Sequence, residues 1–407
     1  MATYYVSATT GNDSNDGSSV ANAFATIGAG EDAATSAGDI VWIAPGIYRE
    51  AVVHGSSGTA ANRIYFIGDP DCEIFGNAVT PGVVRITLAD ANEIASDGTN
   101  VYVVKSNGKD YITWKNVHVD GGSGGVNAYN DSNISYGFYA NAESDEMEVI
   151  NCMAQSVYTG FYYMCNVIDC VAMNCQFYGM YRCKVVDRSI SVCNYYACRE
   201  IDLLRNSIAQ GVFTSIQNCD VIQNCFVYGS FYAMTGASNA DYVYDTLIAG
   251  CNYAMGSFST SDTAQIIVSG SYVDGSNYLN INSKAHGIGF GTVRQQWINA
   301  RDPRHGLGGS TDMQGDGLLW PQKPMTLWSI NNLKKLSEAW KPTLYNQALQ
   351  GATSTITSET AGALDILGNP RTMGLPKNMF MEGTSHTTSS RDIGPWEFSN
   401  VEVTSSY

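Results

Sequence analysis

The sequence predicts an all-β protein, a right-handed parallel β-helix solenoid with about 18 residues per coil. Three observations predict this fold: an internal repeat of that length, apolar and polar columns side by side within the repeat, and a composition rich in Gly (41) and Tyr (25) with only 15% charged residues. Stacked coils place strand on strand about 4.8 Å apart, so a single core extends along the axis.

The repeat is clearest from Met147 to Phe226. We expect five successive coils to keep register without an insertion, so that the segment at Val149 returns as Val167, Val185, Leu203 and Val221. An apolar column two residues earlier in the repeat (Met147, Cys165, Cys183, Ile201, Cys219) borders a polar one (Glu148, Asn166, Lys184, Asp202, Asp220). Such columns are typical of short strands with inward and outward faces.

The register extends outward with insertions and divides the chain into three regions. Residues 1–110 form an N-terminal cap and the first coils, and residues 111–283 form the regular β-helix. Further coils are predicted at 111–119, 242–246, 265–269 and 277–282. Residues 284–407 are expected to be an irregular C-terminal region for capping, attachment or oligomerisation.

The cysteines follow the same period. Ten of the eleven lie between Cys152 and Cys251, and the step from Cys152 to Cys170 recurs from Cys165 to Cys183. We expect reduced thiols that pack as small apolar side chains. Stacked positions also lie within disulfide range, so the oxidised alternative stays open.

The net charge of -16 disfavours nucleic acid and anionic membranes as partners. No apolar run is long enough to span a membrane. The first residues show neither the basic nor the apolar region of a secretory signal, so we expect synthesis in the cytoplasm of a host.

Motifs at both ends resemble the pectate-lyase-like right-handed β-helix superfamily. The N-terminal motif combines residues 4–7 with the Asn- and Asp-rich residues 11–17, and residues 24–34 lead into an expected capping helix near Glu31. Residues 38–50 are similar to the first coil of that superfamily, and residues 365–371 with 392–398 to its closing element. The resemblance implies a parallel β-helix and a choice among polysaccharide lyases, glycoside hydrolases and phage tailspikes.

The outward columns contain candidate residues for two kinds of catalytic site. A lyase needs a base and a cation beside the sugar carboxylate, for which Lys184 and Arg205 are the candidates. A hydrolase needs two nearby carboxylates, and Asp169 and Asp187 would lie about 5 Å apart if they stack on adjacent coils. The alternative interpretation is a set of outward polar residues that pair across coils.

No cofactor is expected. The Asp- and Asn-rich turn near the N-terminus leaves Ca²⁺ open as an alternative, with Asp13 and Asp16 as the candidate ligands. A plain turn stabilised by its own side chains explains the same residues.

Aromatic residues form the most suggestive pattern. Phe177, Phe213 and Phe231 are expected to belong to the core, because adjacent residues cannot both point inward. The nearby tyrosines are then expected on the surface as a glycan-binding strip: Tyr162, Tyr178, Tyr181 and Tyr196.

The predicted function is a virion structural protein, a spike, fibre or surface decoration of a phage, that presents a β-helix to host glycans or proteins. This places it on the virion surface, with other virion proteins and host surface polysaccharide as partners, as a homo-oligomer and specifically a trimer. A catalytic role is not favoured. The alternatives are a polysaccharide lyase or glycoside hydrolase acting as a depolymerase, and an extracellular adhesin-like module.

Overall fold

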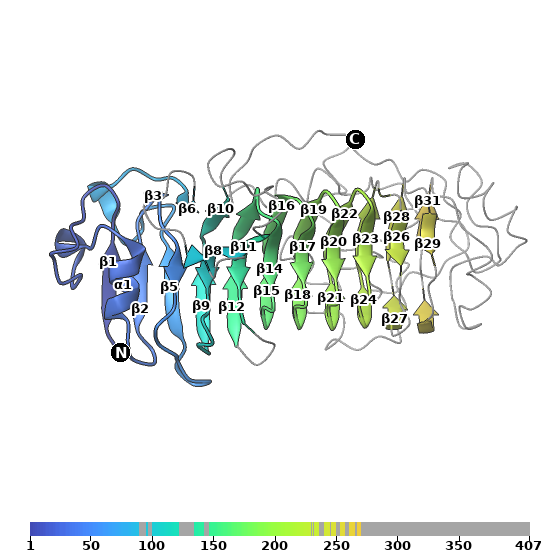
Figure 1. Ribbon diagram of the computed structural model, residues 1–407, viewed down its shortest axis with the longest axis horizontal. Helices are drawn as coiled ribbons and strands as arrows, with labels where there is room; N and C mark the ends of the chain where they lie inside the picture. Colours follow the sequence, from blue (N-terminus) through green and yellow to red (C-terminus); the bar gives the residue numbers. More distant parts are fainter. Residues whose placement is uncertain are drawn as a thin grey trace, which may run out of the picture. The chain divides into compact units, whose positions relative to one another are not determined.

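Short parallel strands form three sheets in the computed structural model, which describes residues 1–88, 95–96, 100–121, 134–141, 146–228, 230, 232–235, 240–244, 246–249, 253–256, 260–264 and 267–269. The chain divides into two units: unit 1 contains residues 1–185 and 192–194, and unit 2 contains residues 186–191 and those from 195 onward in the described range. In each unit successive strands join the first, second and third sheet in turn (Figure 1). This is an all-β parallel β-helix, which confirms the predicted fold class.

Unit 1 contains the first coils. Its first sheet has the order β1 (Thr3–Val6), β2 (Ile40–Ile43), β5 (Ile64–Gly68), β9 (Ile112–Lys115), β12 (Met147–Ile150), β15 (Asn166–Ile168). Its second sheet has the order β3 (Gly46–Tyr48), β6 (Val84–Thr87), β10 (His118–Asp120), β13 (Met153–Gln155), β16 (Val171–Cys175). Its third sheet has the order β4 (Val52–Val53), β8 (Asn100–Lys105), β11 (Ile134–Tyr139), β14 (Thr159–Tyr162), β17 (Tyr178–Tyr181), and β7 (Ala95–Ser96) pairs antiparallel with β8.

Unit 2 repeats the arrangement. Its first sheet follows the order β18 (Val185–Asp187), β21 (Leu203–Arg205), β24 (Val221–Gln223), β27 (Ala240–Tyr244), β30 (Thr260–Ala264). Its second sheet follows the order β19 (Ile190–Cys193), β22 (Ile208–Gly211), β25 (Phe226–Tyr228), β28 (Leu247–Ala249), β31 (Ile267–Ser269). Its third sheet consists of β20 (Tyr196–Arg199), β23 (Thr214–Gln217), β26 (Tyr232–Thr235), β29 (Tyr253–Gly256).

The predicted capping helix is present as α1 (Ile27–Ala33), and it begins four residues before the expected Glu31. Thr26 caps its first turn by accepting a hydrogen bond from the backbone N–H of Ala29. Gly30 allows the helix to approach β1, because a Cβ at this position would lie 2.7 Å from Val6. Two short 3-10 helices, η1 (Val20–Asn22) and η2 (Gly76–Ala78), complete the helical content of the described chain.

One turn position between the first and second sheets takes a left-handed backbone conformation in six successive coils of the described chain, from β9 to β24. Its occupants have φ between 48° and 57°: Asn116, Asn151, Asp169, Arg188, Asn206 and Asn224. Asn is favoured there because it tolerates this conformation better than most residues do. Asn151 also donates from Nδ2 to Oδ1 of Asn116 at 2.8 Å, so the turns of successive coils are tied together.

The expectation of coils without an insertion is wrong at one coil. Val149 pairs with Val167, as the repeat predicts, but Thr159 pairs with Tyr178, one residue beyond the predicted step. The carbonyl of Tyr158 accepts from the backbone N–H of both Phe177 and Tyr178, so two residues face one, as in a β-bulge. The buried equivalents of Val149 and Val167 are therefore Val186, Leu204 and Ile222, one residue beyond those predicted.

Aromatic, aliphatic and thiol side chains fill the interior of the coils whose side chains the structure describes. Phe138 and Phe161 stack at 5.4 Å inside unit 1, and both are fully buried. The ten cysteines of the described chain are all free and buried. This agrees with the expected reduced thiols.

The cysteines are expected to be unreactive in the native protein. Burial raises the pKa of Cys152 and of Cys165 to about 12, so the reactive thiolate is scarce at neutral pH. Titration with a disulfide reagent should detect at most one thiol, Cys251, which lies outside the described residues, and all eleven in denaturant. Rapid reaction of several native thiols would contradict the packing described here.

In the described part of the chain, no helix is long and apolar enough to cross a membrane.

The predicted coil at 277–282 and the C-terminal region 284–407 lie outside the described residues, so the boundaries at 110 and 283 stay predictions.

Candidate functional site

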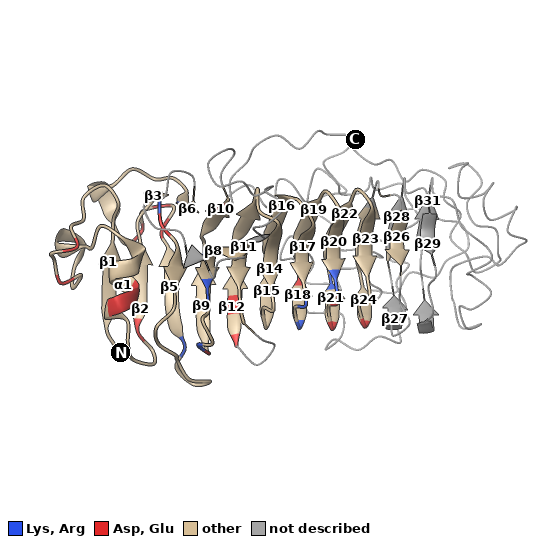
Figure 2. Ribbon diagram, viewed as in Figure 1, with Lys and Arg blue, Asp and Glu red and all other residues tan. Residues whose placement is uncertain are grey.

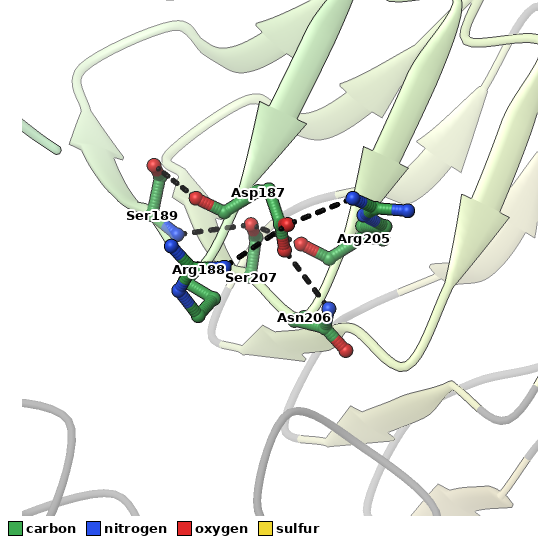
Figure 3. A network of polar contacts seen from close by, with 6 residues as sticks. All are labelled: Asp187, Arg188, Ser189, Arg205, Asn206 and Ser207. Carbon is green, nitrogen blue, oxygen red and sulfur yellow. Dashed lines mark hydrogen bonds and ion pairs between the residues drawn. The ribbon is translucent and has the colours of Figure 1, made fainter. Parts of the chain in front are cut away.

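Asp187 is the centre of a polar network in unit 2 (Figure 3). It ends strand β18, and its carboxylate is only 5% exposed. Arg205 lies 3.0 Å and Arg188 3.3 Å from Oδ2, while Asn206 donates to Oδ1 at 2.9 Å. Figure 2 shows the two signs of charge close together near β18 and β21.

The network satisfies the carboxylate from three directions. Both oxygens of Asp187 accept charge-assisted or amide hydrogen bonds, which fix its orientation. Serine hydroxyls hold the adjoining backbone: Ser189 Oγ donates to the backbone carbonyl of Asp187, and the backbone N–H of Ser189 donates to Ser207 Oγ at 3.1 Å. Asp187 and Arg205, two of the predicted catalytic residues, are thus brought together as a buried ion pair.

Asp169 and Asp187 occupy different positions in their coils, and their predicted pairing stays a prediction. Asp169 occupies the left-handed turn position, with φ of 54°, whereas Asp187 is the last residue of a strand. In the neighbouring repeat the same turn position belongs to Arg188. The predicted stacking of the two carboxylates assumed an unbroken repeat, and the extra residue at the bulge removes that equivalence.

Lys184 lies in unit 1 and pairs with a different acid. Its Nζ is 3.0 Å from Oε1 of Glu146, and the two side chains are 39% and 35% exposed. This ion pair lowers the pKa of Glu146. The predicted base is therefore one member of a half-exposed ion pair, a type of contact that contributes little to stability.

The tyrosines of unit 1 form a row on the outside of the third sheet. We call Tyr136, Tyr139, Tyr162, Tyr178 and Tyr181 the tyrosine face; all five are half-buried. Neighbouring rings contact one another, with centroids 5.2 Å apart for Tyr139 and Tyr162, 5.2 Å for Tyr162 and Tyr181, and 4.2 Å for Tyr178 and Tyr181. The row includes three of the four predicted glycan-binding tyrosines, and the fourth, Tyr196, belongs to unit 2.

Cations lie over the rings at both ends of this row. Lys105 Nζ is 4.2 Å from the centroid of Tyr102 and 5.9 Å from that of Tyr139. The guanidinium of Arg182 is 5.0 Å from the centroid of Tyr181 and donates to the hydroxyl of Tyr163 at 2.6 Å. Burial raises the pKa of Tyr162 further above physiological pH.

The phenylalanines expected in the core lie elsewhere. Phe177 is half-buried and stacks on Tyr158 at 5.2 Å, at the bulge, rather than inside the coil. Phe213 is half-buried in unit 2, where it stacks on Tyr195 at 4.7 Å and meets Tyr196 edge-on. The core prediction is wrong for both residues, because the aromatic positions precede the strands of the third sheet; Phe231 lies outside the described residues.

Asp13 and Asp16 hold the N-terminal turn together. Asp13 Oδ1 accepts from the backbone N–H groups of Ala25 and Thr26 at 2.7 and 3.0 Å. Asp16 accepts from the backbone and hydroxyl of Ser18, which lowers its pKa. No group of three His, Cys, Asp or Glu that could hold a metal ion occurs among the residues that the structure describes.

Comparisons with known proteins return structural similarity only. No family model matches the sequence, and no curated protein matches it. A rhamnogalacturonan lyase is 16% identical with a TM-score of 0.41, over 65% of this chain and 74% of its own. The pectate lyase Pel9A is 14% identical with a TM-score of 0.43, over 98% and 96%.

A GH136 lacto-N-biosidase from Eubacterium ramulus is 11% identical with a TM-score of 0.41, over 66% of this chain and 63% of its own. At these identities and scores the similarities carry no inference about activity. The tyrosine face and the Asp187 network have to be interpreted from their own geometry.

The cations beside the tyrosine face were not predicted. Lys105 ends β8, and Arg182 directly follows β17 in a left-handed turn conformation with φ of 56°. A basic residue directly after an outward tyrosine, as in Tyr181-Arg182, is the sequence signal that could have identified Arg182.

Proposed function

We propose that the tyrosine face of unit 1 binds a glycan, and that the protein is a carbohydrate-recognition β-helix. The observation that carries the proposal is the unbroken row of half-buried rings with centroids 5.2 Å apart on successive coils. That interval is comparable with the length of one sugar residue in an extended chain. Each ring can then stack against the apolar face of one sugar.

The chemistry of the row favours a sugar over a purely apolar partner. Every ring carries a hydroxyl, and Lys105 over Tyr139 and Arg182 over Tyr181 add donors. Sites for small polar ligands combine such aromatic walls with a few fixed polar groups. Because the rings pack on one another, little side-chain freedom remains to be lost on binding.

Catalysis is not part of this proposal. Asp187 is satisfied by two arginines and an asparagine, and Lys184 is paired with Glu146. Asp169 belongs to a turn. The network of Figure 3 is better explained as a stabilising ion pair than as a lyase or hydrolase centre.

The virion role, the host polysaccharide partner and the trimer stay predictions from the sequence. Analytical ultracentrifugation of the full chain checks the trimer, and a monomer would remove that part of the prediction.

Replacing Tyr181 with Ala is expected to weaken glycan binding about tenfold, which corresponds to about 1.4 kcal/mol. Tyr181 contacts Tyr162, Tyr178 and Arg182, so its loss interrupts the row. The measurement is affinity electrophoresis in gels containing members of a panel of bacterial surface polysaccharides.

Tyr65→Ala is the matched control. Tyr65 is also half-buried beneath a cation, with Lys115 Nζ 5.4 Å from its ring, but it belongs to the first sheet. The Tyr65→Ala variant should be retarded in the polysaccharide gels as strongly as the unmodified protein. Equal retardation of both variants, or no retardation by any polysaccharide, would overturn the proposed function, with thermal unfolding used to confirm that both variants fold.

A further inference from the structure

The two cations beside the tyrosine face of unit 1 are separated by a fixed interval. Lys105 is the last residue of β8 and pairs in register with Tyr139 of β11. Arg182 directly follows Tyr181, the last residue of β17. Strands β8, β11, β14 and β17 follow one another in the third sheet (Figure 1), so the two cationic residues are three coil steps, or about 14 Å, apart along the row.

Lys105 is a half-buried cation that contacts rings instead of a carboxylate. Its Nζ lies 4.2 Å from the ring centroid of Tyr102 and 5.9 Å from that of Tyr139, and it forms no ion pair with any residue that the structure describes. Lys184 of the same unit has the opposite arrangement, with its Nζ 3.0 Å from Glu146. In a chain with a net charge of -16, the charge of Lys105 is thus kept for a partner outside the described residues.

Arg182 is held over the other end of the row. Its guanidinium lies 5.0 Å from the ring centroid of Tyr181 and 5.4 Å from that of Tyr163, and Nη1 donates to the hydroxyl of Tyr163 at 2.6 Å. These contacts fix the orientation of the guanidinium. Its planar set of five N–H donors matches the two oxygens of a carboxylate.

The part of the row between the cations is uncharged. Strands β11 and β14 contain no acidic or basic residue. Tyr139 and Tyr162, with ring centroids 5.2 Å apart, occupy the positions between Lys105 and Tyr181 in the same outward column. A carboxylate placed there would lose water beside the negative faces of aromatic rings and gain no cation in return.

We propose that the glycan bound by the tyrosine face is an acidic polysaccharide with widely spaced charges, about one sugar acid in every three residues. This inference rests on the proposed function. Two carboxylates three sugars apart pair with Lys105 and Arg182, and the neutral sugars between them lie on Tyr139 and Tyr162. Because the ring interval of 5.2 Å corresponds to one sugar, three sugars cover the three coil steps between the cations.

Two other classes of glycan fit this pattern of charge less well. A neutral glycan gains nothing from the charge of Lys105. A polymer with an acid on every sugar places carboxylates on the uncharged rings, and the net charge of -16 repels it as a whole. The spacing of the acidic groups, rather than their number, is therefore the feature that the row selects.

Biolayer interferometry of the full chain on immobilised polysaccharides tests this inference. The probes are linear capsular polysaccharides with one uronic acid in each trisaccharide repeat, the same polymers after chemical reduction of their carboxyl groups to alcohols, and polygalacturonate. The native polymers are expected to bind about tenfold more tightly than their reduced forms, and also more tightly than polygalacturonate. Added salt should narrow the difference between native and reduced forms, because the charges lie at the surface.

Lys105→Gln is the main variant. It removes the charge at one end of the row, so the ratio of affinities between native and reduced polymers should fall from about tenfold to about threefold. Lys105→Met replaces it should the first variant not fold. Lys115→Gln is the matched control, because Lys115 also lies over a tyrosine, with Nζ 5.4 Å from the ring of Tyr65, but belongs to the first sheet. The control should keep the tenfold ratio.

The outcomes separate this inference from the proposed function. Equal binding of native and reduced polymers, tighter binding of polygalacturonate, or an unchanged ratio in a folded Lys105 variant would each overturn the spaced-charge inference and leave a glycan-binding tyrosine face standing. Failure of every polymer to bind would overturn both.

Discussion

Replacing Asp187 with Ala is expected to lower the free energy of unfolding by about 3–5 kcal/mol. The substitution leaves Arg188 and Arg205 facing each other without the carboxylate that both now contact, at 3.3 and 3.0 Å. Both arginine side chains are 19% exposed, so water can replace only part of the lost interaction. Asn206 also loses the acceptor for its side-chain amide.

The ion pair of Lys184 provides the comparison. Glu146→Ala removes the carboxylate of a half-exposed pair and should change the free energy of unfolding by less than about 1 kcal/mol. Urea unfolding followed by circular dichroism measures both variants. Equal urea midpoints for Asp187→Ala and Glu146→Ala would show that the Asp187 network does not stabilise unit 2. The Asp187 carboxylate would then again be a candidate functional group.

Replacing Trp114 with Ala is expected to lower the free energy of unfolding by about 3–5 kcal/mol, because it removes a large buried side chain. Trp114 is fully buried in β9 and stacks on Phe66 at 4.6 Å. Its indole N–H donates to His54, which lies 3.6 Å from Glu31 of α1. The side chain therefore supports both the core of unit 1 and the contact that holds the capping helix.

Trp114→Phe separates these two contributions. The variant retains an aromatic ring but leaves His54 Nε2 without a donor, so the expected loss is about 1–3 kcal/mol. Trp42→Ala, at a half-buried position in β2, should cost less than Trp114→Ala. Thermal unfolding measures all three; a loss for Trp42→Ala as large as that for Trp114→Ala would contradict the assigned packing.

The fold could be predicted because period and columns depend on local spacing alone. The register could not, because neighbouring residues at Val185–Val186, Leu203–Leu204 and Val221–Ile222 are both apolar, and either frame buries a suitable side chain. The extra residue is absorbed where Tyr158 accepts from two successive backbone N–H groups. A bulge of this kind leaves no signal in the hydrophobic pattern.

The candidate sites also differ in how far they depend on the register of the coils. Tyr178 and Tyr181 of β17 lie half-buried on the outer face of the sheet, while Gly179 and Met180 between them are buried; the glycan-binding role of the tyrosines stays a prediction. The pairing of Asp169 with Asp187 stays a prediction, although the one-residue change of register places Asp169 in a turn and Asp187 at the end of a strand.

Hydroxyl-radical footprinting of the tyrosines, with and without a polysaccharide that retards the protein in affinity gels, locates the binding surface. The tyrosine face predicts that bound polysaccharide protects Tyr162, Tyr178 and Tyr181 from oxidation, while Tyr65 on the first sheet is oxidised as before. Unchanged oxidation of those three rings in the presence of bound polysaccharide would contradict the glycan-binding role of the third sheet.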